Sequence, residues 1–264
     1  MRFFYNFAIM DPVRITAVSY YNTLPFIYGI KHSGLLTGYD LSLDVPSECA
    51  RKIISDEADI GLVPVGALPA IKEYRLVSDL CIGADKVVKS VLLLANTYLE
   101  NLKTIYLDTD SRTSVNLVQI LATKSWNISP QWKSLLELKG KVASDEGMVL
   151  IGDKTFGLCK QYPFCYDLAG EWIKFTALPF VFAAWIARKP LPESFETAFR
   201  SALAWGVDNR EKSVILADKL HITEYELISY LRNDISYPLD NHKAKGMELF
   251  LKYMSENISM QDSF

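Results

Sequence analysis

The sequence predicts an α/β fold in two lobes with a cleft between them. Short β-rich runs alternate with helical patterns over the first two thirds of the chain, and the chain after Pro192 is mostly helical by periodicity. Two long apolar runs, VVKSVLLLA (87–95) and FVFAAWIA (180–187), bracket the middle segment. A chain that leaves one lobe, builds another and returns crosses between them twice. We therefore expect residues 1–95 and 181–264 in lobe 1 and 96–180 in lobe 2; the alternative is one continuous sheet with a helical tail.

The elements of the first part follow from local signals. Strands are expected at 13–18, 41–45 and 59–63, the last ending at Pro64. A helix is expected at 24–31, beginning near Pro25. A second helix is expected from the N-cap Ser47 to about residue 57. The run 87–95 is rich in valine and leucine and is expected to be a long strand that crosses between the lobes.

A second α/β unit is expected to follow. Its predicted strands lie at 104–107, 132–136 and 148–151, its helices at 113–124 and 167–174, and the strand 180–187 returns the chain to lobe 1. Helices are then expected in SFETAFRSALAWGVDN, KSVILADKL, TEYELISYLRN and from about Asn241 onward.

Composition narrows the classes of function. The 264 residues are 50% hydrophobic with a net charge of −3, which is typical of a globular protein and argues against nucleic acid as a partner. No run approaches the roughly 18 apolar residues of a membrane span, so no membrane partner is expected. Residues 1–10, MRFFYNFAIM, lack the apolar core of a secretory signal and are interpreted as a short extension of a soluble cytoplasmic protein. The four cysteines have no zinc-ligand spacing, and we expect them to be reduced.

One cluster of polar residues is typical of an anion site. Ser111, Arg112, Thr113 and Ser114 follow a predicted strand and open a predicted helix, so hydroxyls and unpaired N–H groups coincide there. The segment lacks the glycines and lysine of a nucleotide-binding loop, which makes a carboxylate the better ligand. Simple capping of the helix by Ser111 or Thr113 would explain the same residues.

Other candidates stand at the ends of predicted strands, where open α/β sheets bind ligands. Tyr20 offers a flat wall for a ring and Asn22 a neutral donor and acceptor, although an asparagine before a helix is also a routine cap. Further candidates at strand ends are Pro46, Ser47, Val63, Gly152 and Asp153. Ser90 is a candidate because it is the lone hydroxyl in the apolar run 87–95.

Groups that could act as bases are scarce among these candidates. The only histidines are His32, His221 and His242, and no carboxylates have metal-ligand spacing, so no metal and no cofactor is predicted. An enzyme of this kind would work by positioning and electrostatics, or its substrate would supply the base.

These segments together resemble the chorismate dehydratase family of the futalosine route to menaquinone. The similar stretches, spread over most of the chain, are SYYNTLPFIYGI (19–30), VPSECARKI (45–53), ADIGLVPVGALP (58–69), KSVLLL (89–94), DSRTSVNLVQILA (110–122), IGDK (151–154) and DLAGEWIKFTALPFVFAAWI (167–186). The resemblance implies a periplasmic-binding-protein-like (type II) fold with a central interlobe cleft.

The resemblance also implies an activity, the cofactor-independent loss of water from chorismate to give 3-[(1-carboxyvinyl)oxy]benzoate. It places the catalytic asparagine at Asn22 and the site serine at Ser90, with a substrate carboxylate at 111–114. We hypothesise that the enolpyruvyl carboxylate of the substrate takes the proton while Asn22 and Ser90 orient it.

Two rival functions remain on this fold. The sibling 1,4-dihydroxy-6-naphthoate synthase uses a histidine in its second lobe, and no histidine lies between His32 and His221 here. A transport solute-binding protein would bind in the same cleft without reacting, but would carry a secretion signal. The sequence does not predict an oligomeric state.

Overall fold

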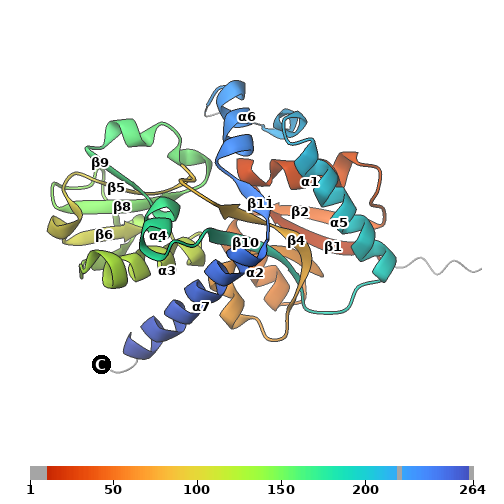
Figure 1. The fold of residues 1–264 in the computed structure, drawn as a ribbon, viewed down its shortest axis with the longest axis horizontal. Coiled ribbons are helices and arrows are strands. Elements are labelled where there is room, and N and C mark those ends of the chain that lie inside the picture. Colours follow the sequence, from red (N-terminus) through yellow and green to blue (C-terminus); the bar gives the residue numbers. More distant parts are fainter. Residues whose placement is uncertain (1–10, 219–221, 262–264) are drawn as a thin grey trace, which may run out of the picture.

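The computed structural model describes residues 11–218 and 222–261, so the predicted extension at residues 1–10 lies outside the described part. The described chain forms two β-sheets side by side, with helices packed around each (Figure 1). This is the predicted α/β class with a helical C-terminal segment.

The first sheet has six strands in the order β11-β4-β10-β3-β1-β2. β1 is parallel to β2 and β3, whereas β10 is antiparallel to β3 and β4, and β11 is antiparallel to β4. The strands are β1 (Val13–Val18), β2 (Tyr39–Asp44), β3 (Ile60–Pro64), β4 (Arg75–Ala84), β10 (Phe180–Ala187) and β11 (Ser236–Pro238).

The second sheet has five strands in the order β7-β6-β8-β5-β9. β6 is parallel to β7 and β8, and β5 is antiparallel to β8 and β9. The strands are β5 (Val91–Ala95), β6 (Thr104–Leu107), β7 (Gln131–Ser134), β8 (Glu146–Ile151) and β9 (Phe164–Asp167).

Helices cover both sheets, and the last one joins them. α7 packs its buried Phe250 against Phe180 of β10 and against Trp172 of α4, and Lys124 beyond α3 pairs with Glu256 at 2.7 Å. The helices are α1 (Leu24–His32), α2 (Pro46–Ile54), α3 (Arg112–Leu121), α4 (Leu168–Thr176), α5 (Glu193–Asp208), α6 (Glu224–Asn233) and α7 (Asn241–Gln261), with short turns η1 (Tyr21–Thr23), η2 (Val65–Ala70) and η6 (Asp153–Thr155).

The structure differs from the sequence-based elements around the crossing between the sheets. β4 was not predicted, because Ser78 and Asp79 interrupt its apolar run as a turn would. The strand expected at 87–95 begins only at Val91, because Lys89 has a left-handed backbone (φ 63°). β5 pairs with β8 and β9, so the chain passes to the second sheet before residue 91 rather than after residue 95.

The cysteines also depart from expectation in part. Cys49 and Cys81 are free and buried, as predicted. Cys159 and Cys165 are paired in a disulfide, with their Cα atoms 5.3 Å apart across the turn that leads into β9.

Candidate functional site

A partly open cavity lies between the two sheets. Val18, Ile82 and Phe182 of the first sheet face Val91 and Ile151 of the second across it. Seven predicted site residues line the cavity, namely Tyr20, Asn22, Pro46, Ser90, Ser111, Ser114 and Gly152. The lining residues that were not predicted are Val18, Pro64, Ile82, Val91, Ile151, Phe182 and Ala183. The candidates after β1, those at the start of α3 and Ser90 therefore line the same cavity.

The other five predicted residues do not line the cavity. Val63 is buried within β3, while Ser47 and Arg112 are exposed. Thr113 and Asp153 instead make hydrogen bonds that hold the two sides of the cavity together.

The start of α3 presents hydroxyl groups to the cavity. Ser111 is the N-cap, and its Oγ accepts hydrogen bonds from the Ser114 backbone N–H and from the Ser114 hydroxyl, both at 3.3 Å. Capping and cavity lining therefore coincide in the same serine. The positive end of the helix dipole and the two nearly buried hydroxyls make this wall suited to an anion.

Thr113 joins α3 to the first sheet. Its Oγ1 accepts the Gly66 backbone N–H at 2.9 Å and donates to the Phe182 carbonyl at 3.1 Å. A Cβ on Gly66 would lie 2.7 Å from the Thr113 nitrogen, so only glycine permits this approach. Nearby, the Ser47 backbone N–H donates to the Asp110 carbonyl at 3.1 Å, which ties the start of α2 to the same loop.

The Tyr20 ring packs directly against Gly152. The Gly152 backbone, with φ 72° and ψ −157°, is accessible essentially only to glycine, and a Cβ there would lie 2.9 Å from the ring. The next residue, Asp153, accepts the Tyr21 backbone N–H with both carboxylate oxygens, at 3.0 and 3.3 Å. The loop after β8 thus fixes both Tyr20 and the entry to η1.

Tyr20 is a neutral hydrogen-bond donor at ordinary pH. Burial raises the pKa of its hydroxyl, and the nearby carboxylates of Asp108, Asp110 and Asp153 raise it further. Asp108 itself is buried and ion-paired with Lys154 at 2.5 Å.

Ser90 is positioned by its own backbone neighbours. Asp167 accepts the N–H groups of Val88 at 2.9 Å and Lys89 at 2.6 Å, and the Lys89 ammonium pairs with the nearly buried Asp234 at 2.8 Å. Burial raises the pKa of Asp167 even though backbone N–H groups oppose the shift. The Gly152 N–H then donates to the Ser90 carbonyl at 2.9 Å, so Ser90 is held at the crossing between the sheets.

Asn22 is held by residues from the C-terminal segment. The Tyr237 hydroxyl donates to the Asn22 carbonyl at 3.1 Å, and the Asn22 Oδ1 accepts from Thr23 Oγ1 at 3.1 Å. Tyr230 of α6 donates to Ser90 Oγ at 2.8 Å. Sequence reasoning missed both tyrosines, because each fits an ordinary buried position in an apolar pattern.

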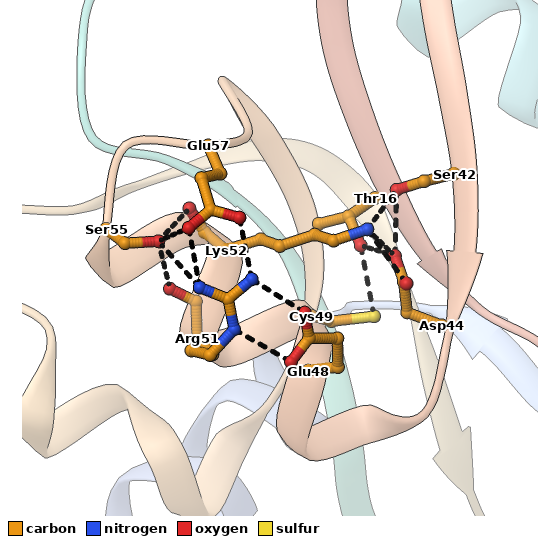
Figure 2. A network of polar contacts seen from close by, with 9 residues as sticks. All are labelled: Thr16, Ser42, Asp44, Glu48, Cys49, Arg51, Lys52, Ser55 and Glu57. Carbon is orange, nitrogen blue, oxygen red and sulfur yellow. Dashed lines mark hydrogen bonds and ion pairs between the residues drawn. The ribbon is translucent and has the colours of Figure 1, made fainter.

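A polar network behind α2 fixes the helix that brings Pro46 to the cavity (Figure 2). The Asp44 carboxylate accepts from Lys52 at 2.7 Å and from the hydroxyls of Thr16 and Ser42, both at 2.8 Å. Burial alone would raise the pKa of Asp44, but these three donors outweigh it and hold the pKa below its usual range. β1, β2 and α2 are thereby joined at one carboxylate.

The described part of the cavity wall carries no ionised side chain. None of its fourteen lining residues within 11–218 and 222–261 is Asp, Glu, His, Lys or Arg, so their polar groups are hydroxyls, an amide and backbone groups. Within residues 11–218 and 222–261, no group of three or more His, Cys, Asp and Glu side chains could hold a metal ion. In the same part of the chain, no helix has the length and apolar character needed to cross a membrane.

Comparison with solved structures places the fold. A protein of Archaeoglobus fulgidus superposes with a TM-score of 0.74 at 13% identity, covering 95% of this chain and 99% of that one. The periplasmic aliphatic sulphonate binding protein of Escherichia coli superposes with a TM-score of 0.60 at 16% identity, covering 94% and 92%. A Candida albicans protein described as having the generic periplasmic binding protein fold gives 0.63 at 10% identity, covering 93% and 90%. The predicted periplasmic-binding-protein-like fold is confirmed.

Comparison of sequences identifies the family. The chorismate dehydratase of Thermus thermophilus is 28% identical over 91% of this chain and 94% of its own length. That of Campylobacter jejuni is 31% identical over 63% of each chain. The profile described as menaquinone biosynthesis matches residues 13–256, and the chain therefore belongs to the menaquinone biosynthesis family.

Proposed function

We propose that this chain is a chorismate dehydratase, which removes water from chorismate to give 3-[(1-carboxyvinyl)oxy]benzoate without a cofactor. The observation that carries the proposal is the cavity between the sheets, where Asn22, Ser90, Ser111 and Ser114 converge. The similarity to the Thermus thermophilus enzyme over nearly the whole chain supports it.

The reaction breaks two bonds on neighbouring ring carbons. The C–H bond next to the enolpyruvyl ether gives its electron pair to a new ring double bond, and the adjacent hydroxyl leaves with a proton as water. Because the ring becomes aromatic, the product side is strongly favoured. The protein has only to place a base near the hydrogen and to stabilise the departing oxygen.

We assign the base to the enolpyruvyl carboxylate of the substrate. Among the residues that the structure describes, no carboxylate, imidazole or amine lines the cavity, so these residues offer no ordinary general base. Asn22 and Ser90 would orient that carboxylate, and the second carboxylate would lie against Ser111 and Ser114 at the start of α3. Catalysis would then come from positioning a base already attached to the substrate.

The test is turnover of chorismate, followed by the ultraviolet absorbance of the aromatic product. Wild-type protein is expected to form the product, while Asn22→Ala and Asn22→Asp are expected to lose roughly 100-fold or more in kcat. Asn209→Ala serves as a control, because that side chain donates only to the Trp205 carbonyl within α5. Near-wild-type rates in Asn22→Ala would remove Asn22 from the mechanism, and binding of chorismate without product would favour a non-catalytic binding protein.

A further inference from the structure

The hydroxyl of Tyr230 is a buried polar group next to the cavity. The Tyr230 side chain is only 2% exposed, and its ring stands edge-on to Phe156 with centroids 4.9 Å apart. Its hydroxyl donates to Ser90, one of the two residues to which the proposed function gives catalytic roles.

The direction of this hydrogen bond decides what faces the ligand. Tyr230 donates to Ser90 Oγ at 2.8 Å, so the hydroxyl hydrogen of Ser90 is left to point elsewhere. The Asn22 amide is oriented separately, because Asn22 Oδ1 accepts from Thr23 Oγ1 at 3.1 Å.

Ser90 and Asn22 both line the cavity, so the Ser90 hydroxyl and the Asn22 amide can donate to a ligand there. Two neutral donors match the two oxygens of a carboxylate. Without the Tyr230 hydroxyl as its donor, Ser90 could turn its own hydroxyl and accept instead of donate.

We propose that Tyr230 is a positioning residue that fixes the hydroxyl of Ser90 as a donor toward a substrate carboxylate. The inference rests on the proposed function for the identity of the substrate, but the arrangement of the two side chains can be tested without it. Tyr230 is 140 residues from Ser90 in the sequence, and α6 lies at the junction of the two halves of the molecule (Figure 1).

The test uses the full chain with Tyr230→Phe, which removes only the oxygen and keeps the ring against Phe156. We expect kcat with chorismate to fall roughly 10- to 100-fold while KM changes less than threefold, because orientation of the base is lost rather than contact with the substrate. Tyr39→Phe is the matched control. Tyr39 lies on β2, which contributes no residue to the cavity, and its hydroxyl donates to the Ile30 carbonyl of α1. The rate of this control is expected to equal that of the wild type.

A double variant separates positioning from general loss of stability. If Tyr230 acts through Ser90, adding Tyr230→Phe to Ser90→Ala should lower kcat less than threefold further, whereas independent effects would multiply. A full further loss in the double variant, or a rate within twofold of wild type for Tyr230→Phe alone, would overturn the proposal.

Crystal structures of ligand-free wild type and Tyr230→Phe complete the test. The variant is expected to show a second rotamer of Ser90, and an identical Ser90 side chain in both structures would refute a positioning role. This arm needs no turnover. Failure of the wild-type protein to convert chorismate would therefore refute the proposed function and leave the role of Tyr230 to be decided by the crystallographic comparison.

Discussion

Substitution of Gly152 by alanine tests how the cavity is built. Gly152 lies directly after β8, lines the cavity and supports the ring of Tyr20. Alanine adds a single methyl group and leaves the Gly152 N–H bond to the Ser90 carbonyl in place. The substitution therefore changes the backbone preference and the contact with Tyr20, and nothing else directly.

Two costs add in this variant. The backbone at φ 72° and ψ −157° is accessible essentially only to glycine, and holding alanine there costs about 1–3 kcal/mol. The new Cβ would stand 2.9 Å from the Tyr20 ring, which has to move and which itself lines the cavity. For a chain of this size each kcal/mol lowers Tm by roughly 2–4 °C. We expect a lower Tm together with a substrate cavity altered by the displaced ring.

Gly140→Ala is the matched control, because Gly140 also has a left-handed backbone (φ 85°) but has no atom within 4 Å of an added Cβ. Thermal unfolding and chorismate kinetics are measured on both variants. Gly140→Ala is expected to lose stability while keeping the wild-type kcat/KM, whereas Gly152→Ala should also lose at least about tenfold in kcat/KM, equivalent to roughly 1.4 kcal/mol. Equal kinetic losses in the two variants, or an unchanged kcat/KM in Gly152→Ala, would refute the role assigned to Gly152.

Three further predictions follow from the site. Thr113→Val leaves the buried N–H of Gly66 without its acceptor and should lower the free energy of unfolding by about 1–3 kcal/mol in denaturant titrations; a loss below about 0.5 kcal/mol would contradict the contact between α3 and η2. Because no described residue of the cavity wall carries an ionised side chain, the KM for chorismate should change less than about threefold between 0.05 and 0.5 M salt, and a steep salt dependence would point to a cation at the site. The pKa of Asp44 is held below its usual range, so the stability it contributes is present above the unfolded pKa of about 4 and is lost as pH falls through the lower folded pKa. Asp44→Asn should therefore be less stable than wild type at pH 7, and the difference in Tm should narrow in acid; a constant difference would exclude the linkage.

The residues at strand ends could be predicted from the sequence because their signals are local. Tyr20 and Asn22 follow β1, and Ser111 opens α3 after β6. Parallel strands within each sheet bring such ends to one edge of that sheet, so a linear pattern is enough to predict which edge of each sheet carries these residues.

The other half of the site depends on contacts that no local pattern encodes. Tyr230 reaches Ser90 only because α6 folds back over the junction of the sheets, and within its own helix it is one more buried residue beside Leu227 and Leu231. Asp167 looks like a helix cap, and it does cap α4, but it also holds the backbone before Ser90. β4 was missed for a related reason, since its pairing with β10 and β11 comes from distant parts of the chain.

The uncharged wall of the cavity agrees with a mechanism in which the substrate supplies the base. An arginine or lysine against the enolpyruvyl carboxylate would stabilise its ionised form and lower its pKa, which would make it a weaker base. Neutral donors such as Ser90 and Asn22 fix the direction of a carboxylate while withdrawing less of its basicity. Removal from water strengthens that basicity further, because burial disfavours the charged form of an acid. A wall of neutral donors therefore binds the carboxylate less tightly than an ion pair would, but leaves it a stronger base. Higher basicity is useful to an enzyme, whereas a transport protein only has to bind.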